Sequence, residues 1–104
     1  MQIVFKQEYL SSLYYNQTAD QKNWFQPEVV KKYIKVVNIL KNAKAVEDLF
    51  PFHSLNYKAL SGDKAGIESV RVTDKYRLEF QTERKEGDVI VTVCNILNLS
   101  NHYQ

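Results

Sequence analysis

This chain has few of the residues that cross-link a fold, break it into segments or bind metal. Its one cysteine, Cys94, excludes an internal disulfide and a cysteine-rich metal site. Together with two histidines it matches no common zinc spacing, and we expect neither a metal nor another cofactor. Only two prolines and three glycines occur in 104 residues, and we see no linker, repeat or low-complexity segment. We therefore expect residues 1–104 to form one domain.

Long hydrophobic runs and a strong charge of one sign are also missing. The apolar stretch near the N-terminus, Ile3-Val4-Phe5, is far too short for a signal peptide. No segment approaches the ~20 apolar residues of a membrane span, so we expect a cytoplasmic protein with no membrane contact. The net charge of +2 permits nucleic-acid binding but does not indicate it, because a strongly basic footprint is absent.

The first half of the chain has the apolar spacing of helices. After a short strand at residues 2–5, a short helix is predicted at residues 7–15, and a longer one begins at Pro27, which suits a first helical turn. Apolar residues of the longer helix follow amphipathic spacing, at Val29, Val30, Tyr33, Val36, Val37 and Leu40. Its other face carries Lys31, Lys32, Lys35 and Lys41. We interpret these lysines as a solvated surface, with a contact to RNA or an acidic partner as the alternative.

The second half has the alternating pattern of strands. A helical turn at residues 45–50 and an irregular connection at residues 51–65 come first. Three strands follow, at residues 67–73, 76–84 and 89–98. Their short connections require antiparallel pairing. Helices followed by a meander predict an α+β fold, with the N-terminal helices packed on one face of a small antiparallel sheet.

Strand alternation places two arginines on one face of the first hairpin. With Thr73-Asp74-Lys75 as a three-residue turn, Arg71 lies opposite Arg77. The other face then collects an apolar row of Val70, Val72, Tyr76, Leu78 and Phe80. A two-residue turn would mix the faces. Two guanidinium groups on a rigid sheet are suited to a phosphate; the alternative is that Glu79 pairs with one arginine on a solvated face.

The register of the last strand depends on its turn. With Glu86-Gly87 as a two-residue turn, Phe80 pairs with Val93 and Thr82 with Val91. This register predicts that Val89, Val91 and Val93 join the core face, and that Thr92, Cys94 and Ile96 join the arginine face. His102 is expected on the arginine side if the strand direction persists.

At these residues the chain resembles a toxin family. The run Leu60-Ser61-Gly62-Asp63-Lys64-Ala65-Gly66-Ile67-Glu68-Ser69-Val70-Arg71-Val72, followed by Tyr76-Arg77-Leu78, is similar to the RelE/HigB toxins of bacterial toxin–antitoxin pairs. The tail Leu99-Ser100-Asn101-His102-Tyr103-Gln104 resembles the histidine and tyrosine cluster of HigB-like members. The resemblance covers essentially the whole chain. It implies a type II toxin, an endoribonuclease that cleaves mRNA on the ribosome by metal-free attack of a 2′-hydroxyl. The implied partners are a cognate helix-turn-helix antitoxin, the ribosome and mRNA.

The resemblance also implies roles for individual residues. Arg71 and Arg77 match the paired strand arginines, which would stabilise phosphate charge. His102 matches the tail histidine and is the candidate general acid or base, because imidazole titrates near neutral pH. Lys58 lies near the position of a HigB histidine and would add charge or transfer a proton; a surface lysine is the alternative. Candidate RNA contacts are Tyr103, Tyr57, Lys64 and Lys75.

The chain departs from the family pattern at three positions. Ser61 replaces a usual lysine, Glu68 replaces a common aromatic residue, and Asn101 stands where an acidic residue is frequent. These departures leave a second hypothesis open, a non-catalytic module of the same fold that binds RNA or protein with a degenerate site.

Overall fold

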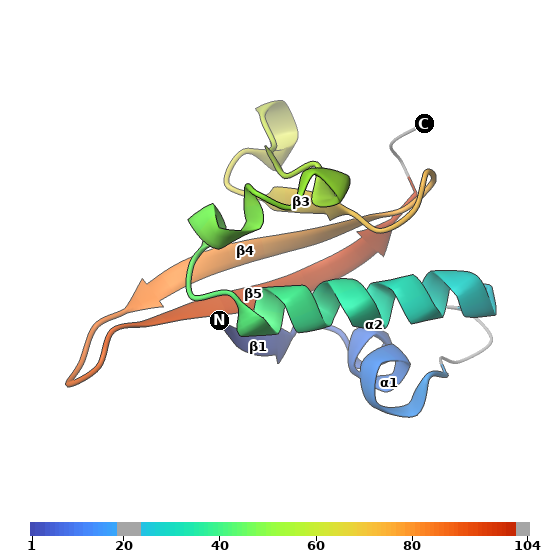
Figure 1. Cartoon of the computed structure of the whole chain (residues 1–104), viewed down its shortest axis with the longest axis horizontal. Coiled ribbons are helices and arrows are strands. Elements are labelled where there is room, and N and C mark those ends of the chain that lie inside the picture. Colours follow the sequence, from blue (N-terminus) through green and yellow to red (C-terminus); the bar gives the residue numbers. More distant parts are fainter. Residues whose placement is uncertain (19–23, 102–104) are drawn as a thin grey trace.

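In the computed structural model, which describes residues 1–18 and 24–101, two helices pack against a five-stranded sheet of order β1-β5-β4-β3-β2 (Figure 1). The helices are α1 (Glu8–Asn16) and α2 (Pro27–Asn42). The strands are β1 (Gln2–Phe5), β2 (Lys58–Ala59), β3 (Glu68–Arg71), β4 (Arg77–Lys85) and β5 (Val91–Ser100). Among the described residues, short 3-10 helices lie in the connections, η2 (Val46–Leu49), η3 (His53–Leu55) and η4 (Gly62–Lys64). The predicted α+β fold, with its N-terminal helices on the sheet, is confirmed.

The helices bury the apolar positions that their sequences mark. All six predicted core positions of α2 are buried, as are Leu10 and Leu13 of α1. The Tyr33 hydroxyl of α2 donates to the Leu10 carbonyl oxygen of α1 at 2.8 Å, which joins the two helices inside the core. Pro27 occupies the start of α2, where its missing N–H leaves no intrahelical bond unmade. None of the helices within the described residues has the length and hydrophobicity needed to cross a bilayer.

The first hairpin has the predicted register. Arg71 pairs with Arg77 and Val70 with Leu78, while Val72 and Tyr76 close the three-residue turn by a backbone bond of 3.0 Å. The apolar row on the other face is buried against the helices, and Val70, Leu78 and Phe80 are fully inaccessible. The pattern predicts this register because a slip of one residue would expose the whole row.

The predicted register of the last strand is wrong. Residues 86–90 form the connection, and Phe80 pairs with Ile96 instead of Val93, while Thr82 pairs with Cys94 instead of Val91. Cys94 and Ile96 therefore lie in the core, and not on the arginine face. Val89 and Val91, predicted for the core, are 73% and 36% exposed. The hairpin end extends beyond the helices (Figure 1), so its valines have no core to face.

A β-bulge in β5 changes which of its residues lie on the arginine side of the sheet. The register shifts between Glu79 and Phe80, so that Glu79 pairs with Asn98 and Arg77 with Ser100. One extra residue on a bulged strand moves the following side chains to the opposite face. Before the bulge, Cys94 and Ile96 lie in the core, whereas after it Asn98 and Ser100 lie opposite Glu79 and Arg77.

Two edge strands complete the sheet. The predicted strand at residues 2–5 is β1, and it pairs parallel with β5, from Gln2 against Val93 to Phe5 against Ile96. The connection at residues 51–65 contains the unpredicted β2, in which Lys58 pairs with Ser69. A strand of two residues has too little alternation to be detected in a sequence.

Candidate functional site

Two rows of cross-strand neighbours form what we call the arginine face, the side of the sheet opposite the apolar core row. One row consists of Arg71, Arg77 and Ser100, and the next consists of Lys58, Ser69, Glu79 and Asn98. Residues directly opposite one another in a sheet share a face, with Cβ atoms roughly 5 Å apart. The sheet therefore gathers three cationic side chains from three strands.

Arg77 is the fixed member of this group. Its side chain lies over β3, and the residue is only 7% exposed. Its Nε donates to the Ser69 hydroxyl at 3.0 Å, and its Nη2 donates to the carbonyl oxygens of Asn56 at 2.6 Å and of Ser69 at 3.3 Å. A guanidinium held by several acceptors in a partly desolvated place keeps a defined orientation.

Arg71 is the exposed member. Its side chain is 47% exposed and forms an ion pair with Asp74 in the β3–β4 turn. An exposed pair of this kind contributes little to stability, because water and salt screen it. An incoming phosphate can therefore take the place of Asp74 at low cost.

A buried carboxylate lies beside the two arginines. Glu79 is 5% exposed, and its Oε2 accepts a bond of 2.6 Å from Lys64 Nζ of η4. This contact brings Lys64, predicted to bind RNA, to the arginine face. A buried carboxylate needs such a partner, because desolvation without compensation is costly. The arginine face therefore carries cationic side chains from β2, β3, β4 and η4 around the buried carboxylate of Glu79.

The other predicted RNA contacts lie elsewhere. The Tyr57 ring packs against Phe80 and Phe50, with centroids 6.4 and 5.2 Å away, which places it on the helix side of the sheet. Its hydroxyl donates to Glu68 at 2.5 Å, and burial followed by this bond raises the pKa of Tyr57. Lys75 lies in the β3–β4 turn, beside α2.

His102 and Tyr103 lie outside the described residues. The described part of the chain ends at Asn101, the residue that follows Ser100 at the end of β5. Their predicted roles in proton transfer and RNA contact stay predictions.

The sequence did not indicate the residues that orient Arg77. Ser69 lies two residues before Arg71 in the same strand, so strand alternation alone could have placed its side chain on the arginine face. The Asn56 carbonyl carries no sequence signal, because any residue presents one. Its position depends on the path from η3 into β2, where Asn56 adopts a left-handed conformation with φ of 44°.

No metal site or activated thiol is present in the part of the chain that the structure describes. Within it, no three His, Cys, Asp or Glu side chains are grouped as metal ligands. Cys94 is fully buried, and burial raises the pKa of its thiol to about 12. A protonated, inaccessible thiol is a poor nucleophile.

This arrangement of two helices and a five-stranded sheet is also the fold of a known toxin. The YoeB/ParE toxin from Agrobacterium tumefaciens has the same fold, with a TM-score of 0.60 and 18% sequence identity over 99% of this chain and 100% of that chain. Residues 3–94 match the HigB-like toxins, described as the RelE-like toxin of the type II toxin–antitoxin system HigB. The chain therefore belongs to the HigB-like toxin family. No match was found among curated proteins.

Proposed function

We propose that this HigB-like toxin is a cytoplasmic endoribonuclease that cleaves mRNA on the ribosome and so inhibits translation. The observation that carries the proposal is the pair of cross-strand arginines, of which Arg77 is fixed and Arg71 is exposed. Such a pair provides charge for a phosphate group that gains charge during the reaction. Membership of the family supports the toxin role and the existence of a cognate antitoxin; we infer that this antitoxin has a helix-turn-helix fold.

The proposed reaction is a metal-free transesterification. The ribose 2′-oxygen attacks the adjacent phosphorus and loses its proton to a base, while the 5′-oxygen leaves and gains a proton from an acid. Arg77 and Arg71 stabilise the pentacovalent phosphate from the sheet. His102 is proposed as the acid or base, and Lys58, exposed on β2 opposite Ser69, adds charge or transfers a proton.

The substrate is proposed to be positioned by the ribosome. A net charge of +2 gives weak attraction to free RNA, because nonspecific affinity depends on the number of phosphates that are neutralised. Lys64 on the arginine face and Lys75 in the turn are proposed phosphate contacts, and Tyr103 a base contact. Tyr57 is left out of the proposed site because its ring faces the core.

An alternative is a non-catalytic module that binds RNA or protein. It is motivated by Ser61, Glu68 and Asn101, which depart from the family pattern. Glu68, however, lies on the helix side of the sheet, where it accepts bonds from Tyr57 and from the Thr82 hydroxyl at 2.8 Å. This departure therefore does not alter the arginine face. Cut transcripts in a translating extract would reject the alternative.

Induced expression tests the proposal. We expect the wild type to stop growth and protein synthesis. Arg71→Ala and His102→Ala should each lower the rate of mRNA cleavage by at least about a hundredfold and so restore growth and protein synthesis. Arg84→Ala is the matched control, because Arg84 is an exposed arginine of β4 paired with Glu86 outside the site. Growth that is unaffected by the wild type would refute the toxin proposal. Equal toxicity of all variants would refute the site assignment alone.

A further inference from the structure

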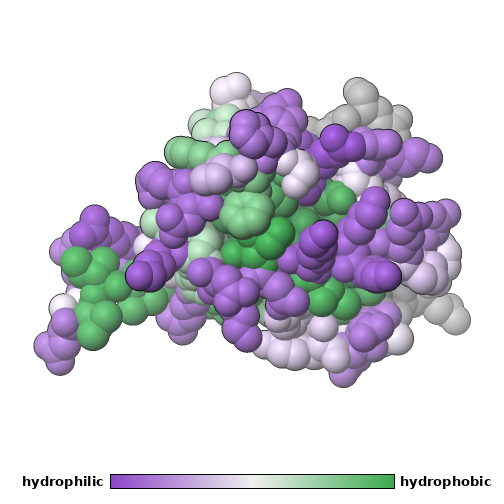
Figure 2. Space-filling view, in the orientation of Figure 1, coloured by the Kyte–Doolittle hydropathy of each residue, from purple (hydrophilic) through white to green (hydrophobic). Residues whose placement is uncertain are grey.

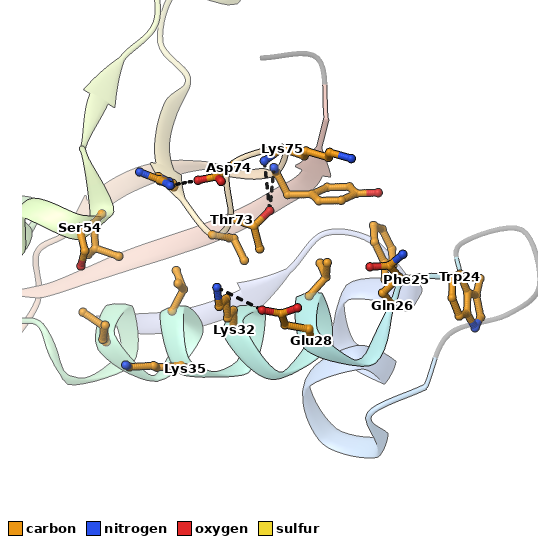
Figure 3. Close-up of a pocket in the computed structure, with 17 residues that line it drawn as sticks. Trp24, Phe25, Gln26, Glu28, Lys32, Lys35, Ser54, Thr73, Asp74 and Lys75 are labelled. Carbon is orange, nitrogen blue, oxygen red and sulfur yellow. Dashed lines mark hydrogen bonds and ion pairs between the residues drawn. The ribbon is translucent and has the colours of Figure 1, made fainter. Parts of the chain in front are cut away.

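A groove runs between α2 and the β3–β4 turn, at the edge of the arginine face (Figure 3). It encloses about 720 Å³, and its apolar lining includes Val36, Ile39, Leu55 and Val72. In Figure 2, hydrophobic surface is visible in the middle of this side of the molecule, bordered by hydrophilic residues. A concave apolar floor inside a polar border is the anatomy of a binding surface.

The rim of the groove is basic. Lys32, Lys35, Arg71 and Lys75 line it, against the two acids Glu28 and Asp74. Both acids are already paired, Glu28 with Lys32 at 3.6 Å and Asp74 with Arg71. Lys35 and Lys75, on opposite sides of the groove in Figure 3, form no ion pair with the other described residues. Their charges are available to acidic groups of a ligand.

An aromatic side chain lies exposed at one end of this groove. Trp24 is 68% exposed and precedes α2, next to Phe25, whose ring packs edge-on against Tyr76 at 5.4 Å. Exposed tryptophan beside an apolar floor is typical of the residues that dominate binding energy in protein interfaces. A second apolar hollow continues along α2 and shares Lys35 and Ile39 with the first.

We propose that this groove, lined by α2 and the β3–β4 turn, is the docking surface for an acidic, amphipathic segment of the antitoxin. The apolar floor would bury one face of the segment, and the lysines of the rim would pair with its carboxylates. An RNA strand fits less well, because it has no aliphatic side chains to bury on the apolar floor.

The position of Arg71 links this surface to regulation, a point that rests on the proposed ribonuclease function. Arg71 lies on the arginine face and also lines the groove. A carboxylate of the docked segment would hold Arg71 on the groove side, as Asp74 does in the free chain. The antitoxin would then withdraw one of the two phosphate-binding cations without covering Arg77.

Trp24 provides a direct readout, since it is the only tryptophan of the chain. The probe is a synthetic, tryptophan-free helical peptide of about 18 residues, with leucines along one face and glutamates on the other. We expect it to shift the Trp24 emission saturably, and a scrambled peptide of the same composition to leave it unchanged. Lys32→Glu with Lys35→Glu should weaken binding by at least about tenfold. Lys6→Glu with Lys41→Glu, two exposed lysines outside the groove, should weaken it less than about twofold.

This titration does not depend on RNA cleavage, so it stands even if the proposed ribonuclease function fails. Absence of a saturable shift, or equal weakening by both double variants, would overturn the proposal. Tighter binding of a single-stranded oligonucleotide with the same dependence on Lys32 and Lys35 would also overturn it and assign the groove to RNA. In cells, a co-expressed cognate antitoxin should neutralise the Lys6/Lys41 variant and fail against the Lys32/Lys35 variant.

Discussion

The two arginines that face each other across β3 and β4 differ in almost every physical respect. Arg77 is buried and makes three hydrogen bonds to Ser69 and Asn56, whereas Arg71 is exposed and paired with a turn aspartate. In the proposed site, this difference would divide the phosphate contacts between a fixed, buried cation and an exposed one. It also means that the two residues affect stability differently.

We therefore predict unequal effects of arginine substitution on stability. Arg77→Ala leaves the Asn56 carbonyl and the Ser69 hydroxyl without their donor, and should lower the free energy of unfolding by roughly 1–3 kcal/mol. Arg71→Ala should change it by less than about 0.5 kcal/mol, like the control Arg84→Ala. Urea unfolding of the three variants measures this. Equal losses for Arg71 and Arg77 would show that Arg77 is not held as described.

Tyr57 provides a second residue-scale prediction. Its hydroxyl donates to Glu68 on the helix side, while Glu68 keeps its bonds to Thr82. Tyr57→Phe should cost about 1 kcal/mol of unfolding free energy and leave RNA cleavage unchanged. Thermal unfolding and cleavage of a ribosome-bound message are the measurements. A large loss of cleavage in a folded variant would show that Tyr57 contributes to the RNA site.

At the scale of elements, the two hairpins that share β4 show why the β3–β4 register was predictable and the β4–β5 register was not. Around Arg71 and Arg77, the apolar row packs on the helices, so burial selects a single alignment. The far end of the β4–β5 hairpin extends past the helices (Figure 1), and residues 83–91 are exposed, so apolar residues there no longer identify a buried face. The bulge after Glu79 has no sequence signal either, although it sets which β5 residue meets Arg77.

The exposed end of this hairpin leads to an element-scale prediction. Val89 and Ile90 are 73% and 57% exposed in the β4–β5 connection, and Figure 2 shows hydrophobic surface at that end of the molecule. Val89→Ser with Ile90→Ser should change the free energy of unfolding by less than about 0.5 kcal/mol, because little buried area is lost. The double variant should aggregate more slowly under light scattering. Marked destabilisation would mean that the hairpin end packs on the body.

For the whole molecule, buried groups predict a loss of stability in alkali. Burial raises the pKa of Cys94 from 9.0 to about 12, and burial also raises the pKa values of Tyr33 and Tyr57 above 10.0. The unfolded chain releases these protons at a pH where the folded chain still holds them. The free energy of unfolding should therefore keep its full value below pH 9 and decrease as the pH rises through 10.

Urea unfolding at a series of pH values measures this dependence. Cys94→Ala removes one of the groups and should make the decline with pH shallower. Stability that stays constant between pH 9 and 12 would contradict the burial of these side chains.

The family and the general shape of the molecule were predictable, because helix periodicity, hairpin alternation and the order of short motifs agree along the chain. The contacts that hold Arg77 and Glu79 in place were less predictable. The Asn56 carbonyl reaches Arg77 through a loop conformation, and Lys64 reaches Glu79 from a 3-10 helix after Ser61. Contacts made by loops depend on backbone paths that carry no periodic pattern.

Cleavage mapping on ribosome-bound messages tests the central claim most directly. In a translating extract, the wild type and Arg84→Ala should produce the same set of cut transcripts, while Arg71→Ala should produce at least about a hundredfold fewer despite normal stability. Intact messages with the wild type, or undiminished cleavage by Arg71→Ala, would contradict the account of the arginine face as a ribonuclease site.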